Sequence, residues 1–138
     1  MEVLIVSCRT ENKKSLMQVF VDLPLVTHCV SNIEQARDFL CSHAVPIIFC
    51  EDRLPDGTYR ELLSSVRSEW PDTRFVVVQC LGEWEEYLEA LHLGADEVVK
   101  CPLEPTDVDL AIIRIFHENS AGYGRGQSSE NEMWFDRA

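Results

Sequence analysis

Two carboxylates stand side by side where a strand is expected to end. Glu51 and Asp52 directly follow an apolar run, within the stretch FCEDRLPDGT at residues 49–58. The apolar run predicts a buried strand, and Pro55 with Gly57 predicts a tight turn soon after it. A strand that ends in carboxylates beside such a turn often presents them in a cleft. Both acids are therefore candidate functional residues.

The rest of the chain predicts five strands that alternate with five helices. The strand candidates are apolar runs typical of strands buried on both faces, and apolar residues between them recur at helical spacing. Ser31 with Glu34 forms a capping box, and Thr58 with Glu61 forms a second one. Gly94 is placed to end the fourth helix. The predicted strands span residues 2–7, 25–30, 46–50, 74–80 and 96–101, and the predicted helices span 10–23, 32–44, 59–70, 83–93 and 104–118.

This alternation predicts an α/β domain in which a parallel sheet lies between two layers of helices. The expected architecture is thus a three-layer, doubly wound (βα)5 fold. In such sheets the functional groups gather beyond the carboxyl ends of the strands. The residues expected at that edge are Ser7, Cys8, Glu51, Asp52, Cys80 and Cys101.

The charge of the chain excludes several classes of partner. The 138 residues suit one domain, and the formal net charge is -12. Nucleic acids and anionic membranes need a compensating basic surface, so neither is an expected partner. No run of 18 apolar residues occurs, so no membrane-spanning helix is expected.

The six cysteines contain no CxxC pair, which removes the local spacing of many metal and redox sites. The first ten residues, MEVLIVSCRT, lack the features of a secretory signal, so we expect a cytoplasmic protein. Because that compartment is reducing, the sequence predicts six free thiols.

The composition changes at the C-terminal end. Residues 1–118 form the predicted domain, whereas residues 119–138 are rich in Gly, Ser, Asn and Gln and are typical of a tail or linker. Met133, Trp134 and Phe135 are the exception within that segment. Two interpretations of them stay open, a frayed tail and an aromatic docking anchor.

The pattern resembles the receiver domain of bacterial two-component response regulators. The resemblance rests on LPDG after a strand that ends in an acid, on GADEVVKCPLEP before the last helix, and on the five βα units. It covers about residues 2–117. It implies a flavodoxin-like fold with strand order 2-1-3-4-5. It also implies that active members accept a phosphoryl group from a histidine kinase on an aspartate, with Mg²⁺ nearby.

The acidic residues of the family are not carried over. By position, its acidic pair after the first strand falls on Ser7 and Cys8. Its phosphoacceptor aspartate, four residues before the loop proline, falls on Glu51. Glu51 is one methylene longer, so its oxygens are displaced from the in-line geometry. Asp52 is a conceivable substitute acceptor, but neighbouring strand residues point to opposite sides.

The remaining switch positions also differ. The family's hydroxyl residue, aromatic switch residue and lysine fall on Cys80, Val98 and Cys101. Lys100 stands one place too early, and strand alternation points it to the other side. The sequence therefore lacks the cation that offsets charge on a transferring phosphoryl group.

Together these substitutions predict a degenerate receiver domain. Magnesium needs oxygen ligands in near-octahedral geometry, and thiols are poor partners for it. We expect a signalling module that acts through protein–protein contacts, with no catalytic residue, no metal and no cofactor. Two interpretations of Glu51 stay open: its charge imitates a phosphorylated aspartate, or it is a solvated acid at a strand end.

The alternative function is a thiol-based one. Cys8, Cys80 and Cys101 are expected near Glu51, and three thiolates with one carboxylate suit Zn²⁺. The same thiols could form a redox pair, or simply fill a collapsed site as small apolar groups. A flavin-binding protein is disfavoured, because the loop after the first strand has no glycine to cradle a phosphate.

Two apolar helix faces are candidate contact surfaces. Trp84, Tyr87, Leu88 and Leu91 form a stripe on the fourth helix, which is typical of either core packing or partner binding. The resemblance implies partner or homodimer contacts through the fourth helix, fifth strand and fifth helix. The candidate interface residues are Trp84, Tyr87, Leu91, Ile112, Ile115 and Phe116.

Overall fold

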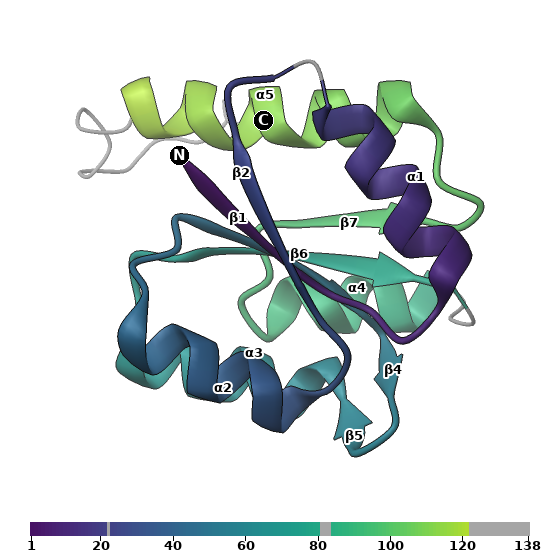
Figure 1. The fold of residues 1–138 in the computed structure, drawn as a ribbon. Helices are drawn as coiled ribbons and strands as arrows, with labels where there is room; N and C mark the ends of the chain where they lie inside the picture. The colour runs from purple at the N-terminus through teal and green to yellow at the C-terminus, as the bar shows by residue number, and fades with distance from the viewer. Residues whose placement is uncertain (22, 81–83, 122–138) are drawn as a thin grey trace.

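A five-stranded parallel sheet forms the centre of the molecule (Figure 1). The computed structural model describes residues 1–21, 23–80 and 84–121. The strand order is β2-β1-β3-β6-β7, which is the predicted order 2-1-3-4-5 when only strands of this sheet are counted. The strands are β1 (Glu2–Val6), β2 (Val26–Val30), β3 (Ile47–Glu51), β6 (Arg74–Gln79) and β7 (Glu97–Lys100).

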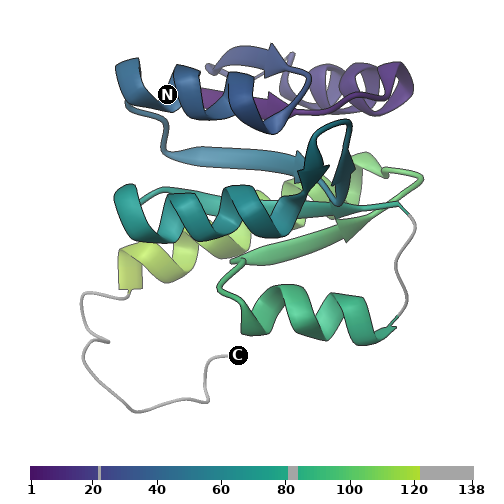
Figure 2. The same cartoon turned by 90° about the horizontal axis from the view of Figure 1, so that it is seen from below.

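Helices cover both faces of the sheet, so the predicted three-layer flavodoxin-like fold is confirmed. Figures 1 and 2 show α1 and α5 on one face and α2, α3 and α4 on the other. None of the helices in the described part of the chain is long and apolar enough to cross a bilayer. The helices are α1 (Thr10–Phe20), α2 (Ile33–Ser42), α3 (Tyr59–Glu69), α4 (Trp84–His92) and α5 (Pro105–Ala121).

Strands β1, β3, β6 and β7 contribute to two separate cores because their side chains alternate between the faces. On β1, Val3 and Ile5 pack under α1 and α5, whereas Leu4 and Val6 pack under α2, α3 and α4. Burial of each such side chain contributes roughly 1.5–3 kcal/mol relative to exposure. The continuous apolar runs that predicted the strands are therefore explained by helices on both sides.

Several element boundaries differ from the prediction. Helix α1 ends at Phe20, before the predicted residue 23. The predicted capping box of Ser31 is wrong, because Asn32 is the N-cap of α2 and its side chain accepts a hydrogen bond from the Gln35 backbone N–H. The capping box of Thr58 with Glu61 is confirmed at the start of α3.

The C-terminal boundary also differs. Helix α5 continues to Ala121, beyond the predicted domain end at residue 118. The aromatic cluster of Met133, Trp134 and Phe135 lies outside the described residues.

A short hairpin that the sequence did not predict follows β3. It pairs β4 (Arg53–Leu54) with β5 (Gly57–Thr58) in antiparallel register. Gly57 has a φ of 151°, a backbone conformation that residues with a side chain rarely adopt, so glycine is favoured there. At the tip, the Asp56 carboxylate accepts the backbone N–H groups of Ile33 at 2.9 Å and Glu34 at 3.1 Å. The hairpin is thereby fastened to the first turn of α2.

The Asp56 contact generates a stability prediction. We expect Asp56→Ala to lower the free energy of unfolding by about 1 kcal/mol, as loss of a helix cap does. The backbone N–H of Ile33 is the main cause that lowers the pKa of the Asp56 carboxyl below its usual 3.8. The Asp56 contribution is therefore present at neutral pH and lost as the pH falls through the folded-state pKa.

Urea denaturation at pH 7 and at pH 3 measures this effect. Asp38→Ala is the matched control, because Asp38 is an exposed carboxylate of α2 that lies outside its first turn. Equal stability of the two variants at pH 7, or an Asp56→Ala deficit that grows on acidification, would contradict the assignment.

Candidate functional site

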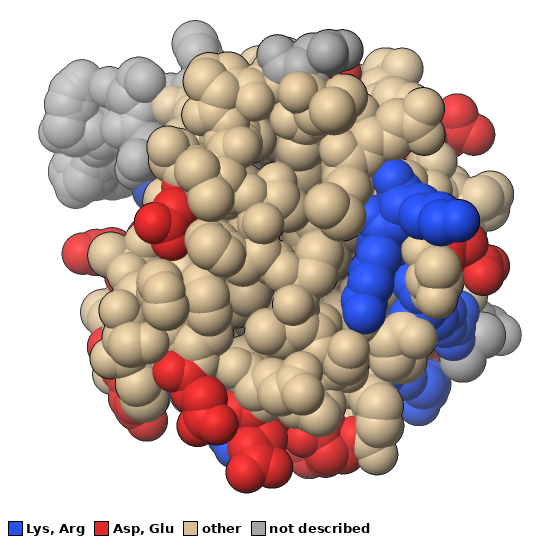
Figure 3. Space-filling model, viewed as in Figure 1, with Lys and Arg blue, Asp and Glu red and all other residues tan. Residues whose placement is uncertain are grey.

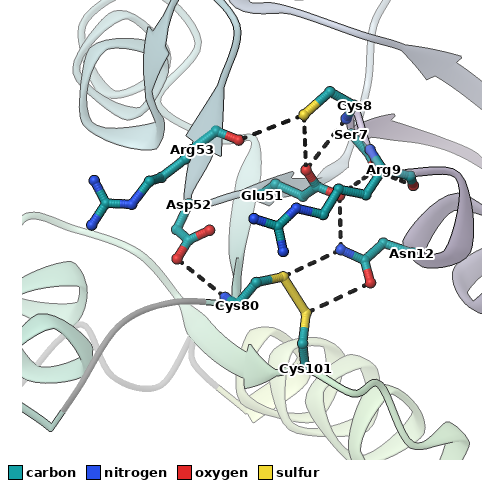
Figure 4. Close-up of a disulfide and its surroundings, with 9 residues drawn as sticks. All are labelled: Ser7, Cys8, Arg9, Asn12, Glu51, Asp52, Arg53, Cys80 and Cys101. Carbon is teal, nitrogen blue, oxygen red and sulfur yellow. Dashed lines mark hydrogen bonds between the residues drawn. A yellow bond between two sulfur atoms is a disulfide. The ribbon is translucent and has the colours of Figure 1, made fainter.

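The carboxyl ends of four strands meet the start of α1 at one edge of the sheet (Figure 4). The side chains that gather there come from the β1–α1 connection, the first turn of α1, and the ends of β3, β6 and β7. We call this group the strand-end cluster. It consists of Ser7, Cys8, Asn12, Glu51, Cys80 and Cys101.

Glu51 is the centre of the strand-end cluster. It is the last residue of β3, and only 1% of its surface is exposed. The Ser7 hydroxyl donates to its Oε2, the Asn12 Nδ2 donates to the same oxygen at 2.8 Å, and the Cys8 backbone N–H reaches Oε1 at 3.3 Å. Both carboxylate oxygens are therefore held by donors from the β1–α1 segment. This arrangement stabilises the buried group without a metal ion.

Asn12 is the functional residue that the sequence reasoning missed. It is buried in the first turns of α1, and its amide nitrogen also lies 3.2 Å from the Cys80 sulfur. A signal was present, because Asn12, Leu16 and Phe20 follow the spacing of a core-facing helix stripe. A polar side chain on such a stripe indicates a buried partner, which here is Glu51.

Cys80 and Cys101 are joined by a disulfide, so the prediction of six free thiols is wrong for this pair. Their Cα atoms are 4.8 Å apart, within the usual range for disulfides. Gln79 and Lys100 are register partners on β6 and β7, so the residues that follow them stand side by side. The sulfur pair therefore results from strand register, which sequence spacing does not reveal.

Asp52 turns away from the Glu51 donors. Its carboxylate accepts the backbone N–H of Cys80 at 3.1 Å, and its own backbone N–H bonds to the Val78 carbonyl at 2.9 Å. Figure 4 shows the two neighbouring carboxylates on different sides of the chain. Asp52 is thus close to the strand-end cluster, but its carboxylate accepts a hydrogen bond from the backbone of Cys80.

The nearby lysine does not enter the strand-end cluster. Lys100 is exposed, and its Nζ lies 5.9 Å from the centre of the Tyr87 ring. Val98 is half-buried and packs against the core on the α2–α4 side. Within residues 1–21, 23–80 and 84–121, no ion pair involves Glu51. No lysine or arginine is therefore paired with the carboxylate at this edge.

The set of ligands expected for a thiol-based metal site, three cysteines and Glu51, is not available in this form. Two of its three sulfurs are bonded to each other, and the third belongs to Cys8. Partial burial, followed by the nearby Glu51 carboxylate, raises the pKa of the Cys8 thiol, which disfavours the thiolate that binds metals. The described residues contain no group of three or more His, Cys, Asp or Glu side chains arranged to hold a metal ion.

No protein-family model matches the chain, but two curated bacterial proteins are similar to part of it. The response regulator protein PilR of Pseudomonas aeruginosa is 24% identical over 82 residues, which are 59% of this chain and 18% of that protein. The hydrogenase transcriptional regulatory protein HoxA of Cupriavidus necator is 28% identical over 90 residues, which are 65% of this chain and 18% of that protein. The chain therefore matches only a minor part of either relative's length.

Solved structures match the chain over most of its length. The signal receiver domain of an HD domain-containing protein from Pseudomonas fluorescens has a TM-score of 0.78 and 21% identity, and the match covers 86% of this chain and 97% of that one. A CheY-like receiver domain from Methanospirillum hungatei has a TM-score of 0.79 and 20% identity, with coverage of 87% and 96%. This chain has the receiver-domain fold.

The fourth helix of this receiver fold carries an exposed apolar face, so core packing does not explain its stripe. Trp84 is 61% exposed and stacks on Tyr87 with ring centres 5.1 Å apart. Leu88 and Leu91 are also exposed. We call Trp84, Tyr87, Leu88 and Leu91 the α4 face. It remains a candidate contact surface.

The candidate contact residues of α5 are less accessible. Ile115 is only 3% exposed and packs in the core, so its predicted place on a surface is wrong. Ile112 and Phe116 are half-buried. The exposed apolar residues of this helix are Leu110 and Ile113, which were not in the candidate set.

The strand-end cluster generates a prediction for Asn12. Asn12→Ala removes a hydrogen bond to a buried carboxylate, so we expect the free energy of unfolding to fall by about 2 kcal/mol. Chemical denaturation monitored by circular dichroism measures the change. Gln18→Ala is the control, because it removes an exposed amide from the same helix. An Asn12→Ala loss no larger than that of the control would show that the amide does not support Glu51.

Proposed function

We propose that this chain is a receiver-fold signalling module that binds other proteins and does not transfer phosphoryl groups. The observation that supports the proposal is the state of Glu51, which stands at the phosphoacceptor-equivalent position. Its two oxygens accept hydrogen bonds from Ser7, Asn12 and the Cys8 backbone, so they are engaged within the protein. On this proposal the chain is a binding module and not an enzyme.

The chemistry of phosphoryl transfer supports this interpretation. The reaction depends on a metal ion and a cation that offset the charge on the equatorial phosphoryl oxygens. Ser7 and Cys8 take the place of the acidic pair, so the carboxylate ligands that Mg²⁺ prefers are missing there. Cys101 takes the place of the lysine, and Lys100 lies against Tyr87 instead.

The contacts of Glu51 favour a structural role over imitation of a phosphorylated aspartate. A mimic would present its charge to the switch positions, which here are Cys80 and Val98. In the part of the chain that the structure describes, the hydrogen bonds to the Glu51 carboxylate come instead from Ser7, Cys8 and Asn12. We infer that Glu51 fastens the β1–α1 segment to the end of β3.

Intact mass spectrometry tests the lack of phosphoryl transfer. We expect no gain of a phosphoryl group after incubation with acetyl phosphate and Mg²⁺, because neither the metal ligands nor the lysine is in place. A receiver domain with a complete acidic pair and lysine serves as the positive control. A stoichiometric gain on this chain would contradict the proposal, and Asp52→Asn would then show whether Asp52 is the acceptor.

A protein is the partner class that the surface charge favours. Figure 3 shows basic side chains gathered in one strip over α1 and acidic side chains along the opposite border of that face. With a net charge of -12, this distribution does not favour phosphate backbones. The α4 face instead offers aromatic and leucine side chains, which are typical contact residues. We infer that it binds a signalling or output protein or a second copy of this chain.

Of these partners, a second copy of the chain is the one we test first. Lys100 and the acidic side chains of α4 carry opposite charges, which allows ion pairs between two copies. We expect a monomer–dimer equilibrium in analytical ultracentrifugation. Trp84→Ala should weaken dimerisation at least about tenfold, as truncation of a central aromatic contact does. Met17→Ala removes an exposed apolar residue on α1, outside the candidate interface, and should change dimerisation less. A strictly monomeric wild-type chain would exclude the homodimer.

A further inference from the structure

We propose that Cys80 and Cys101 form a reversible thiol–disulfide couple that exchanges with low-molecular-weight disulfides of the glutathione class. Its oxidation state would then set how firmly the ends of β6 and β7 are held together. The inference goes beyond the proposed function and does not depend on it. It rests on the geometry of the pair, on its contacts with Asn12, and on its exposure.

The sheet alone brings the two cysteines to bonding distance. Their Cα separation of 4.8 Å equals the ordinary spacing of neighbouring strands. The Cys101 backbone N–H donates to the Gln79 carbonyl at 3.0 Å, so a backbone hydrogen bond also joins the two strand ends. Because of this hydrogen bond, the two sulfurs stay near one another after reduction, and the disulfide can form again.

Asn12 can contact the pair in both oxidation states. Its Nδ2 lies 3.2 Å from the Cys80 sulfur, and its Oδ1 lies 3.6 Å from the Cys101 sulfur. In the reduced state the Cys101 thiol can donate a hydrogen bond to Oδ1, whereas in the disulfide it has no proton to donate. The same Asn12 amide group donates to Glu51, so a change at the sulfurs reaches the buried carboxylate through one side chain.

The pair is partly accessible, unlike the sulfur of Cys50. Cys80 and Cys101 are both half-buried at the end of the sheet, whereas Cys50 is fully buried within β3. Burial also raises the pKa of the Cys50 thiol well above its usual value, which makes it a poor nucleophile. A small disulfide can therefore reach the pair from the strand-end side.

The small disulfide is the oxidant in this exchange. One cysteine, as the thiolate, attacks a sulfur of the small disulfide, which breaks the S–S bond and releases one small thiol. The second cysteine then attacks the mixed disulfide, forms the Cys80–Cys101 bond and releases the second small thiol. The protein loses two electrons and two protons, and the small disulfide gains both. Excess small thiol reverses the sequence.

Equilibration in redox buffers tests the couple directly. The full chain is held at a series of ratios of reduced to oxidised glutathione, its free thiols are alkylated, and peptide masses report which cysteines reacted. We expect Cys80 and Cys101 to pass together from alkylated to disulfide-bonded within the series. A pair that stays fully bonded at every ratio, or fully reduced at every ratio, overturns the proposal.

Single substitutions show whether the pair exchanges with the small disulfide. In Cys80→Ser, we expect Cys101 to form a mixed disulfide with glutathione, because its partner sulfur is missing. Cys41→Ser is the control, because Cys41 is an exposed free thiol on α2 and its loss should leave the Cys80–Cys101 transition unchanged. Absence of the mixed disulfide on Cys101 would mean that the pair does not react with this class of reagent.

Hydrogen exchange tests the structural consequence in the wild-type chain. Reduction removes the covalent link between β6 and β7, so we expect amide exchange in α4 and β7 to become at least about fivefold faster. Helices α2 and α3 lie outside the segment that the disulfide closes, so their amide exchange should change less. Equal exchange of α4 and β7 in the two states would show that the bond does not control this edge. The outcomes of these redox experiments do not depend on whether the chain gains a phosphoryl group from acetyl phosphate.

Discussion

The buried carboxylate of Glu51 is the constraint on which the functional edge of this molecule depends. A carboxylate with 1% exposure is costly to bury unless its oxygens are hydrogen-bonded. Ser7, Cys8 and Asn12 supply those bonds from one continuous segment, and this fixes how the β1–α1 connection lies against β3. An ordinary receiver leaves this space for a metal ion and a phosphoryl group. In this chain the Glu51 carboxylate is engaged by internal hydrogen bonds.

The second feature of this edge is a covalent link between two strand ends. The Cys80–Cys101 disulfide joins the ends of the two strands that flank α4. Asn12 contacts both sulfurs and Glu51, so the carboxylate and the disulfide belong to one network. The buried side-chain amide of Asn12 therefore connects the Glu51 carboxylate with the Cys80–Cys101 disulfide. The exposed α4 face lies on the chain segment between the two cysteines.

Much of the fold could be predicted from the sequence because strands covered on both faces appear as continuous apolar runs. The β4–β5 hairpin was missed because its strands have two residues each, too few to show alternation. The sequence placed Cys80 and Cys101 at the same edge and left a redox pair open beside the prediction of free thiols. Which cysteines bond depends on the register of β6 and β7, and no local motif shows that register. The stripe of Trp84, Tyr87, Leu88 and Leu91 has the same spacing whether it is core or surface. Only the structure shows that Trp84, Leu88 and Leu91 are exposed and that Tyr87 is half-buried.

The most direct measurement is a nuclear magnetic resonance titration of the labelled chain with Mg²⁺ and then beryllofluoride. The backbone amide of Cys8 and the side-chain amide of Asn12 report the Glu51 carboxylate, because both donate to it. If internal donors have replaced the metal site, these two resonances stay unchanged at millimolar Mg²⁺ and on addition of beryllofluoride. Saturable shifts of both resonances would show that the edge still holds a metal ion with a phosphoryl analogue, and would contradict the account.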